Sequence, residues 1–124
     1  DAATGVAPST AEATVRTTVD AYMNAWVLPG YSPEKVKSLM TPQMRERFSE
    51  GDSIATVRDW QVGRPSWEST GAAVLNIRLR ITGRELPGGR TDSFDQEPII
   101  RFRVVLLDGA WYVDEGFMGR LRKQ

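Results

Sequence analysis

The sequence predicts a single α+β domain, in which one long helix and two short ones pack on a curved, cone-shaped sheet of four antiparallel strands. Three observations support this prediction. Apolar residues recur at helical spacing up to about Gly51, and from Ile54 onward they recur at every second residue. Near the C-terminus, Asp108-Gly109 separates two apolar-rich runs, a strong hairpin signal because a type I′ turn needs positive φ at both central positions. A chain of 124 residues is long enough for one domain with one core.

The long helix is expected to begin at Ser9 and to end before Pro29-Gly30. Ser9-Thr10-Ala11-Glu12 matches a capping box, in which the Ser9 hydroxyl accepts from an early helix N–H and Glu12 reaches back. The apolar residues that follow form one stripe, which predicts a single buried face. They are Val15, Val19, Tyr22, Met23 and Trp26.

Two short helices are expected next, each with a hydroxyl residue and a proline at its start. Ser32-Pro33 and Thr41-Pro42 provide an N-cap followed by proline at the first helical position. Gly51 closes the second of them. Their predicted buried residues are Val36, Leu39, Met40, Met44 and Phe48.

Four strands are expected in the second half of the chain. The first is interrupted by Gly63-Arg64-Pro65, which predicts a bulge or an edge before Trp67. The third is long enough to carry Phe94, Ile100, Phe102, Val104 and Leu106 inward. The predicted strands are Val57–Val62, Val74–Thr82, Ser93–Leu107 and Ala110–Phe117.

The N-terminal nine residues are small, polar and without periodicity, which is typical of a linker. Residues 10–124 then form the domain. We hypothesise that a signal peptide, a lipoprotein anchor or a transmembrane helix precedes Asp1 in the full-length protein. The only membrane contact expected is through such an anchor, since no apolar run in the sequence approaches the roughly 20 residues needed to span a bilayer.

The composition excludes several classes of function. Sixteen basic residues balance sixteen acidic ones, so no net charge steers the protein toward nucleic acid. The absence of cysteine rules out disulfides, thiolate metal sites and a cysteine nucleophile. The absence of histidine removes Ser-His-Asp catalysis and the commonest metal ligand. We therefore expect no metal and no cofactor.

This order of elements, closing on Leu107-Asp108-Gly109-Ala110-Trp111-Tyr112-Val113, resembles the nuclear-transport-factor-2-like superfamily, also called cystatin-like. The last hairpin is most similar to that of small extracytoplasmic bacterial members with an Asp-Gly-x-Trp-x-Val pattern. The resemblance covers about residues 10–120. It implies a curved sheet wrapped around the first helix, with a pocket between them. The superfamily hosts isomerases, dehydratases, transport adaptors and secretion scaffolds, so the resemblance does not by itself give a function.

Five aromatic residues are candidates for lining such a pocket, because aromatic walls with polar tips suit small apolar ligands. The more common role of such residues is to fill the core. The candidates are Tyr22, Trp26, Trp60, Phe102 and Trp111.

Three carboxylates lie near apolar positions, namely Asp20, Asp59 and Asp114. A ketosteroid-isomerase-like enzyme would need one of them as a buried base beside a hydroxyl donor such as Tyr22 or Tyr112. Asp20 and Tyr22 diverge by about 200° on a helix. A solvated or ion-paired role is therefore favoured for these carboxylates.

Four arginines are expected on the outer face of the sheet and are candidates for partner binding. Arg78 and Arg80 alternate with apolar residues on one predicted strand, and Arg101 and Arg103 do so on the next. Like charges placed opposite each other are unfavourable, so we expect acidic neighbours among them. Asp95, Glu97 and Glu115 are the candidates for this role. The alternative is an ordinary solvated face.

The favoured hypothesis is a non-catalytic, extracytoplasmic accessory or interaction domain of a bacterial cell-envelope protein, either a lipoprotein or a membrane-anchored protein. Its expected location is the periplasm or the cell surface. Its expected partner is another protein, with a homodimer as one form. Two alternatives stay open: an isomerase or cyclase that uses a carboxylate inside the cone, and a carrier of hydrophobic ligands.

Overall fold

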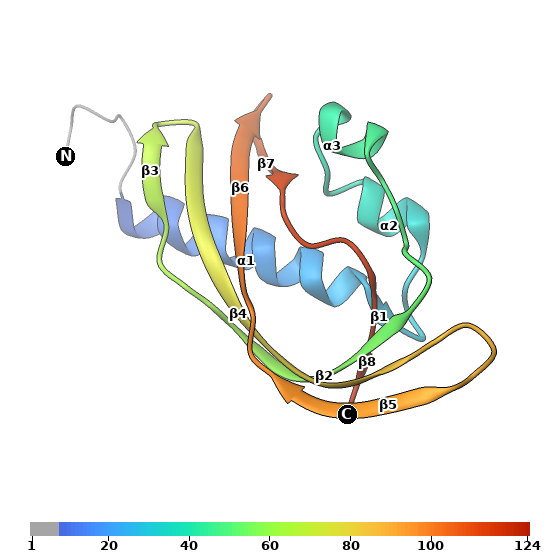
Figure 1. Cartoon of the computed structure of the whole chain (residues 1–124). Helices are drawn as coiled ribbons and strands as arrows, with labels where there is room; N and C mark the ends of the chain where they lie inside the picture. Colours follow the sequence, from blue (N-terminus) through green and yellow to red (C-terminus); the bar gives the residue numbers. More distant parts are fainter. Residues whose placement is uncertain (1–7) are drawn as a thin grey trace.

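A computed structural model describes residues 8–124 of the chain. These residues form a strongly curled sheet with a long helix lying across its hollow side (Figure 1). The helices are α1 (Pro8–Ala25), α2 (Pro33–Lys37) and α3 (Pro42–Glu46). The strands are β1 (Val27–Leu28), β2 (Ile54–Val62), β3 (Ser66–Ser69), β4 (Ala72–Glu85), β5 (Thr91–Gln96), β6 (Ile99–Leu107), β7 (Ala110–Glu115) and β8 (Arg120–Lys123). The α+β class is confirmed.

The prediction of four antiparallel strands was wrong, because the described chain forms one mixed sheet of eight strands in the order β1-β8-β2-β4-β6-β7. The 14-residue strand β4 is its centre and pairs with β2 and β3 on one side and with β5 and β6 on the other. The expected interruption at Gly63–Pro65 separates β2 from β3. The single strand expected over Ser93–Leu107 is broken at Glu97-Pro98, because proline has no N–H for the ladder.

The strands β1 and β8 were not predicted. The strand β8 lies between β1 and β2 and runs parallel to both. Leu121 on β8 pairs with Val27 of β1 on one side and with Ala55 of β2 on the other, and its side chain is fully buried. A two-residue strand and a four-residue strand are too short to show alternation in a sequence.

The helix α1 occupies the hollow of the sheet, as the resemblance implied, but it already includes Pro8. Ser9 is therefore inside the helix and is not its N-cap. The linker expected over residues 1–9 lies, as far as Ala7, outside the described residues. Of the helices in residues 8–124, none is both long enough and apolar enough to cross a membrane.

The short helices begin as predicted. The Ser32 hydroxyl accepts from the Lys35 N–H, and the Thr41 hydroxyl accepts from the Met44 N–H, each at 3.2 Å. Their placement differs from the prediction, because α3 contacts the edge strand β7 and α2 contacts α1 (Figure 1). Between them, the Thr41 N–H donates to the Val113 carbonyl at 2.9 Å. The segment between α2 and α3 thus covers part of the β7 edge.

The core lies between α1 and the inner face of the sheet. The predicted stripe on α1 is fully buried, as are Met40 and Met44, Ile77 and Leu79 of β4, and Phe102 and Val104 of β6, whereas Ile81 and Ile100 are only partly buried. Leu106, expected inside, stays 38% exposed because it lies at the end of β6. The turn after β6 has φ values of 51° at Asp108 and 85° at Gly109, which confirms the predicted type I′ geometry.

Candidate functional site

Three of the five aromatic pocket candidates have no exposed surface: Tyr22, Trp26 and Phe102. The Tyr22 ring meets the Phe102 ring edge to face at 5.7 Å, and its hydroxyl donates to the Phe117 carbonyl at 2.5 Å. Burial raises the pKa of Tyr22, since the phenolate would lose its hydration. These side chains fill the hollow of the sheet in this structure, and their assignment to a ligand pocket stays a prediction.

The other two candidates are half-buried beside α1. The Trp60 indole N–H donates to Asp20 at 2.9 Å, and Lys123 lies over the Trp60 ring at 4.5 Å. A shallow groove of about 460 Å³ lies here. A second, of about 340 Å³, lies between α1, Leu39 and Trp111. The structure therefore separates Trp60 and Trp111 instead of joining them in one cavity.

The three candidate carboxylates have different surroundings. Asp20 accepts from the Trp60 indole and from the Asn24 amide, and Asp59 is exposed on β2 opposite Arg80. Asp114 accepts from the Thr41 hydroxyl at 2.8 Å and from Arg103 at 2.9 Å. None of these contacts is with a tyrosine hydroxyl.

A tyrosine and a carboxylate that sequence reasoning did not single out do form a pair. The Tyr31 hydroxyl donates to Glu50 in a short hydrogen bond beside the core. Burial, together with the Glu50 carboxylate, raises the pKa of Tyr31. The Tyr31 ring also stacks on Trp26, so the pair belongs to the packing at the end of α1.

The four candidate arginines do lie on the outer face of the sheet, here called the arginine face. Arg78 faces Ile99 and Arg101 faces Asn76 in the β4–β6 register, so the arginines do not oppose one another. Each has an acidic partner. The pairs and their N···O distances are Arg78–Glu97 at 3.9 Å, Arg80–Asp95 at 2.8 Å, Arg101–Glu115 at 2.5 Å, Arg103–Glu68 at 2.9 Å and Arg103–Asp114 at 2.9 Å.

The expectation that acidic residues intersperse with the arginines is confirmed for Asp95, Glu97 and Glu115. Glu68 was not predicted as a partner, because its four-residue strand β3 shows little alternation in the sequence. Glu68 comes close to Arg103 only when the chain is folded. Two hydrogen bonds from Arg80 hold the pKa of the Asp95 carboxyl below its usual value. Hydrogen bonds to Glu68 and Asp114 raise the pKa of Arg103. The arginine face is therefore a set of neutralised pairs rather than a basic patch.

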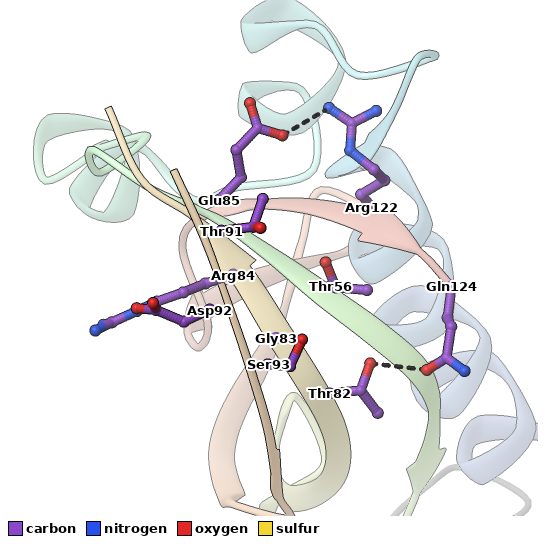
Figure 2. A pocket seen from close by; sticks show the side chains of 10 residues that line it. All are labelled: Thr56, Thr82, Gly83, Arg84, Glu85, Thr91, Asp92, Ser93, Arg122 and Gln124. Atoms are coloured by element: carbon purple, nitrogen blue, oxygen red, sulfur yellow. Dashed lines mark hydrogen bonds and ion pairs between the residues drawn. The ribbon is translucent and has the colours of Figure 1, made fainter. Parts of the chain in front are cut away.

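A polar groove of about 440 Å³ lies where β2, β4, β5 and β8 meet (Figure 2). We call it the Gly83 groove. Gly83 pairs with Thr56 of β2 on one side and with Ser93 of β5 on the other, and Thr56 pairs with Arg122 of β8. Ten residues line it: Thr56, Thr82, Gly83, Arg84, Glu85, Thr91, Asp92, Ser93, Arg122 and Gln124. Sequence reasoning did not identify this groove, because four separate strands build it.

Within residues 8–124, no three acidic side chains lie close enough together to hold a metal ion.

Comparison with known proteins identifies a solved structure with a similar fold. No protein-family model matches the chain. No curated protein matches it either. Among solved structures, the intermembrane-space region of the chloroplast protein ARC6 is similar, with a TM-score of 0.56 and 15% sequence identity. The alignment covers 90% of this chain and 95% of that one. At this identity the similarity extends to the fold alone.

Proposed function

We propose that this chain is a non-catalytic accessory domain of an extracytoplasmic cell-envelope protein and acts through contacts with another protein. The observation that carries the proposal is the filled hollow of the sheet. The buried rings of Tyr22, Trp26 and Phe102 fill the space between α1 and the sheet, where the resemblance implies a ligand pocket. The outer face is left as the broad accessible surface of the sheet.

The structural similarity to the ARC6 region also supports this proposal. The ARC6 region, similar over nearly its whole length, lies in an intermembrane space, a compartment of an envelope. By analogy we place this domain outside the cytoplasm, held at the envelope by a lipoprotein or membrane anchor. The relation to the nuclear-transport-factor-2-like superfamily, and to its bacterial members in particular, is part of the proposal.

The arginine face is our proposed contact surface. Ile99 is 63% exposed beside Arg78, and Leu107 is 40% exposed at the far end of β6. Arginine is enriched at protein–protein interfaces, and the exposed aliphatic side chains add apolar surface beside these ion pairs. A second copy of the chain is one form that the partner could take.

The isomerase and carrier alternatives have less support. Asp20 accepts hydrogen bonds from Trp60 and Asn24 at the edge of an open groove, and the groove beside Trp111 is shallow. Neither arrangement encloses a substrate between the first helix and the sheet.

The proposal is tested by photocrosslinking in source cells that express the full-length protein. A benzophenone side chain is placed at Ile99 or at Leu107 and, as a matched control, at Thr17 on the exposed side of α1. We expect one discrete protein adduct from the two outer-face positions and none from Thr17. Purified partner should then bind Arg101→Gln about tenfold more weakly than the unchanged chain.

Three outcomes would contradict the proposal. One is an adduct from Thr17 that equals those from Ile99 and Leu107. Another is the absence of any adduct from the two outer-face positions. The third is a cytoplasmic location of the full-length protein, as reported by an alkaline phosphatase fusion that stays inactive.

A further inference from the structure

We propose that the Gly83 groove binds a neutral saccharide. The inference is independent of the proposed protein contact, because a glycan site does not require a partner on the arginine face. It rests on three properties of the groove: its shape, its balance of charge, and the hydrogen-bonding capacity that its side chains keep.

The shape follows from the register of four strands. Arg122, Thr56, Gly83 and Ser93 form one row across β8, β2, β4 and β5, with glycine near its centre. Gly83 places no side chain in the groove, and a Cβ there would lie 2.6 Å from the Asp92 carbonyl oxygen. Long side chains stand at the rim (Figure 2). The volume of about 440 Å³ falls in the range of small-molecule sites.

The charges in the groove cancel. Glu85 lies 3.6 Å from Arg122 across it. Arg84 and Asp92 pair with each other at 3.3 Å and point away from it (Figure 2). A charged ligand would therefore meet no net opposite charge. No aromatic or large aliphatic side chain is among the ten lining residues, which disfavours a hydrophobic ligand.

The groove offers hydrogen-bond donors and acceptors side by side. Thr56, Thr82, Thr91 and Ser93 contribute hydroxyls. A hydroxyl can both donate and accept, although that of Thr82 already donates to Gln124. Gln124 contributes an amide, and the Glu85–Arg122 pair contributes a carboxylate and a guanidinium. Sugar hydroxyls also donate and accept, so a polyhydroxylated ring matches this lining.

Some of these polar groups are held in place by hydrogen bonds within the chain and can still form hydrogen bonds to a ligand. The Thr82 hydroxyl donates to the Gln124 amide oxygen at 2.7 Å, which directs the amide while its NH₂ group keeps both hydrogens to donate. The Gln124 backbone N–H is fixed by the Val57 carbonyl at 2.9 Å. The 3.6 Å separation of Glu85 and Arg122 is longer than a hydrogen bond, so both can bond to a ligand. Their side chains are 39% and 51% exposed.

The test is a titration of the ¹⁵N-labelled chain, followed by NMR. The probes are maltose, cellobiose and N,N′-diacetylchitobiose, each added to about 20 mM, which would detect a Kd near 1 mM. We expect saturable shifts of the amides of Thr56, Gly83, Ser93 and Arg122 with at least one disaccharide. Arg122→Ala and the groove-filling Thr56→Leu should each weaken binding about tenfold or more.

The matched control is Arg78→Ala, which is also on β4 but outside the groove and should bind as the unchanged chain does. A spectrum that keeps its dispersion shows that each variant is folded. The inference is overturned if none of the three disaccharides causes saturable shifts, or if both groove variants bind normally. It is also overturned if inorganic phosphate shifts the same amides at lower concentration, since the groove would then be an anion site.

Discussion

The hydroxyl of Thr41 lies 2.8 Å from a carboxylate oxygen of Asp114, which is 73 positions further along the chain. The same hydroxyl accepts from the Met44 N–H as the N-cap of α3. The other oxygen of Asp114 accepts from Arg103 on β6. Thr41 is only 1% exposed, so one buried threonine joins the start of α3 to two strands of the sheet.

Replacing Thr41 with valine keeps the shape of the side chain and removes the hydroxyl. We expect Thr41→Val to lower the free energy of unfolding by about 1–3 kcal/mol, because a helix cap and a hydrogen bond to a charged group are both lost. Thr41→Ser, which keeps the hydroxyl, should cost less. Urea denaturation of both variants provides the measurement. Equal losses for valine and serine would show that the methyl group matters rather than the hydrogen bonds.

The Trp26 indole is the largest fully buried side chain and lies between two rings, Tyr31 at 5.4 Å and Phe48 at 5.7 Å, each nearly parallel to it. We expect Trp26→Ala to cost about 3–5 kcal/mol, since it leaves a cavity and removes two stacking contacts. Trp26→Phe should be intermediate. Denaturant unfolding followed by far-UV circular dichroism measures both. A loss below about 1 kcal/mol for the alanine variant would contradict this packing.

Local signals in the sequence predicted the local features of the fold. The N-caps at Ser32 and Thr41 depend on residues within one turn of a helix, and the Asp108-Gly109 turn depends on two adjacent residues. The placement of acidic residues among the arginines followed from repulsion between like charges on a shared face. Each of these inferences required only short-range physics.

The features that were missed depend on contacts between distant parts of the chain. Leu121 of β8 pairs with Ala55 of β2, and neither a turn motif nor an alternating pattern in the sequence predicts this pairing. The placement of α3 beside β7 depends on the hydrogen bonds that Val113 makes with Thr41 and Leu39. The pairing of Glu68 with Arg103 depends on β3, a strand of four residues.

The Gly83 groove could not be predicted from the sequence, because it too depends on contacts between distant parts of the chain. The four residues of its row, Arg122, Thr56, Gly83 and Ser93, are far apart in the sequence. Irregularities in the pairing of β4 with β2 and with β5, close to Gly83, decide which side chains face it. A change of one residue in register would turn these side chains to the other face of the sheet.

Gly83 itself provides a direct test of the strand arrangement. An added Cβ would lie 2.6 Å from the backbone oxygen of Asp92, which cannot move without shifting β5. We expect Gly83→Ala to destabilise the chain by about 1–3 kcal/mol, as overpacking does, and to shift the amide signals of Asp92 and Ser93. Gly71→Ala is the matched control, because its Cβ would make an ordinary 3.7 Å contact with Leu106. Similar losses in the two variants would contradict the close approach of β4 and β5.

The ion pair between Arg80 and Asp95 makes the stability of the fold depend on pH. Asp95 accepts two hydrogen bonds of 2.8 Å from Arg80, which lower the pKa of its carboxyl in the folded state. A folded-state pKa below the unfolded value of about 3.9 stabilises the fold above that pH, and the contribution disappears as the pH falls through the folded-state value. We expect Arg80→Gln to raise the Asp95 pKa toward about 3.9, as measured by ¹³C NMR titration of the carboxyl carbon. Arg78→Gln, which removes the partner of Glu97 instead, should leave the Asp95 titration unchanged. An Asp95 midpoint that is the same in the unchanged chain and in Arg80→Gln would show that the pair does not persist in solution.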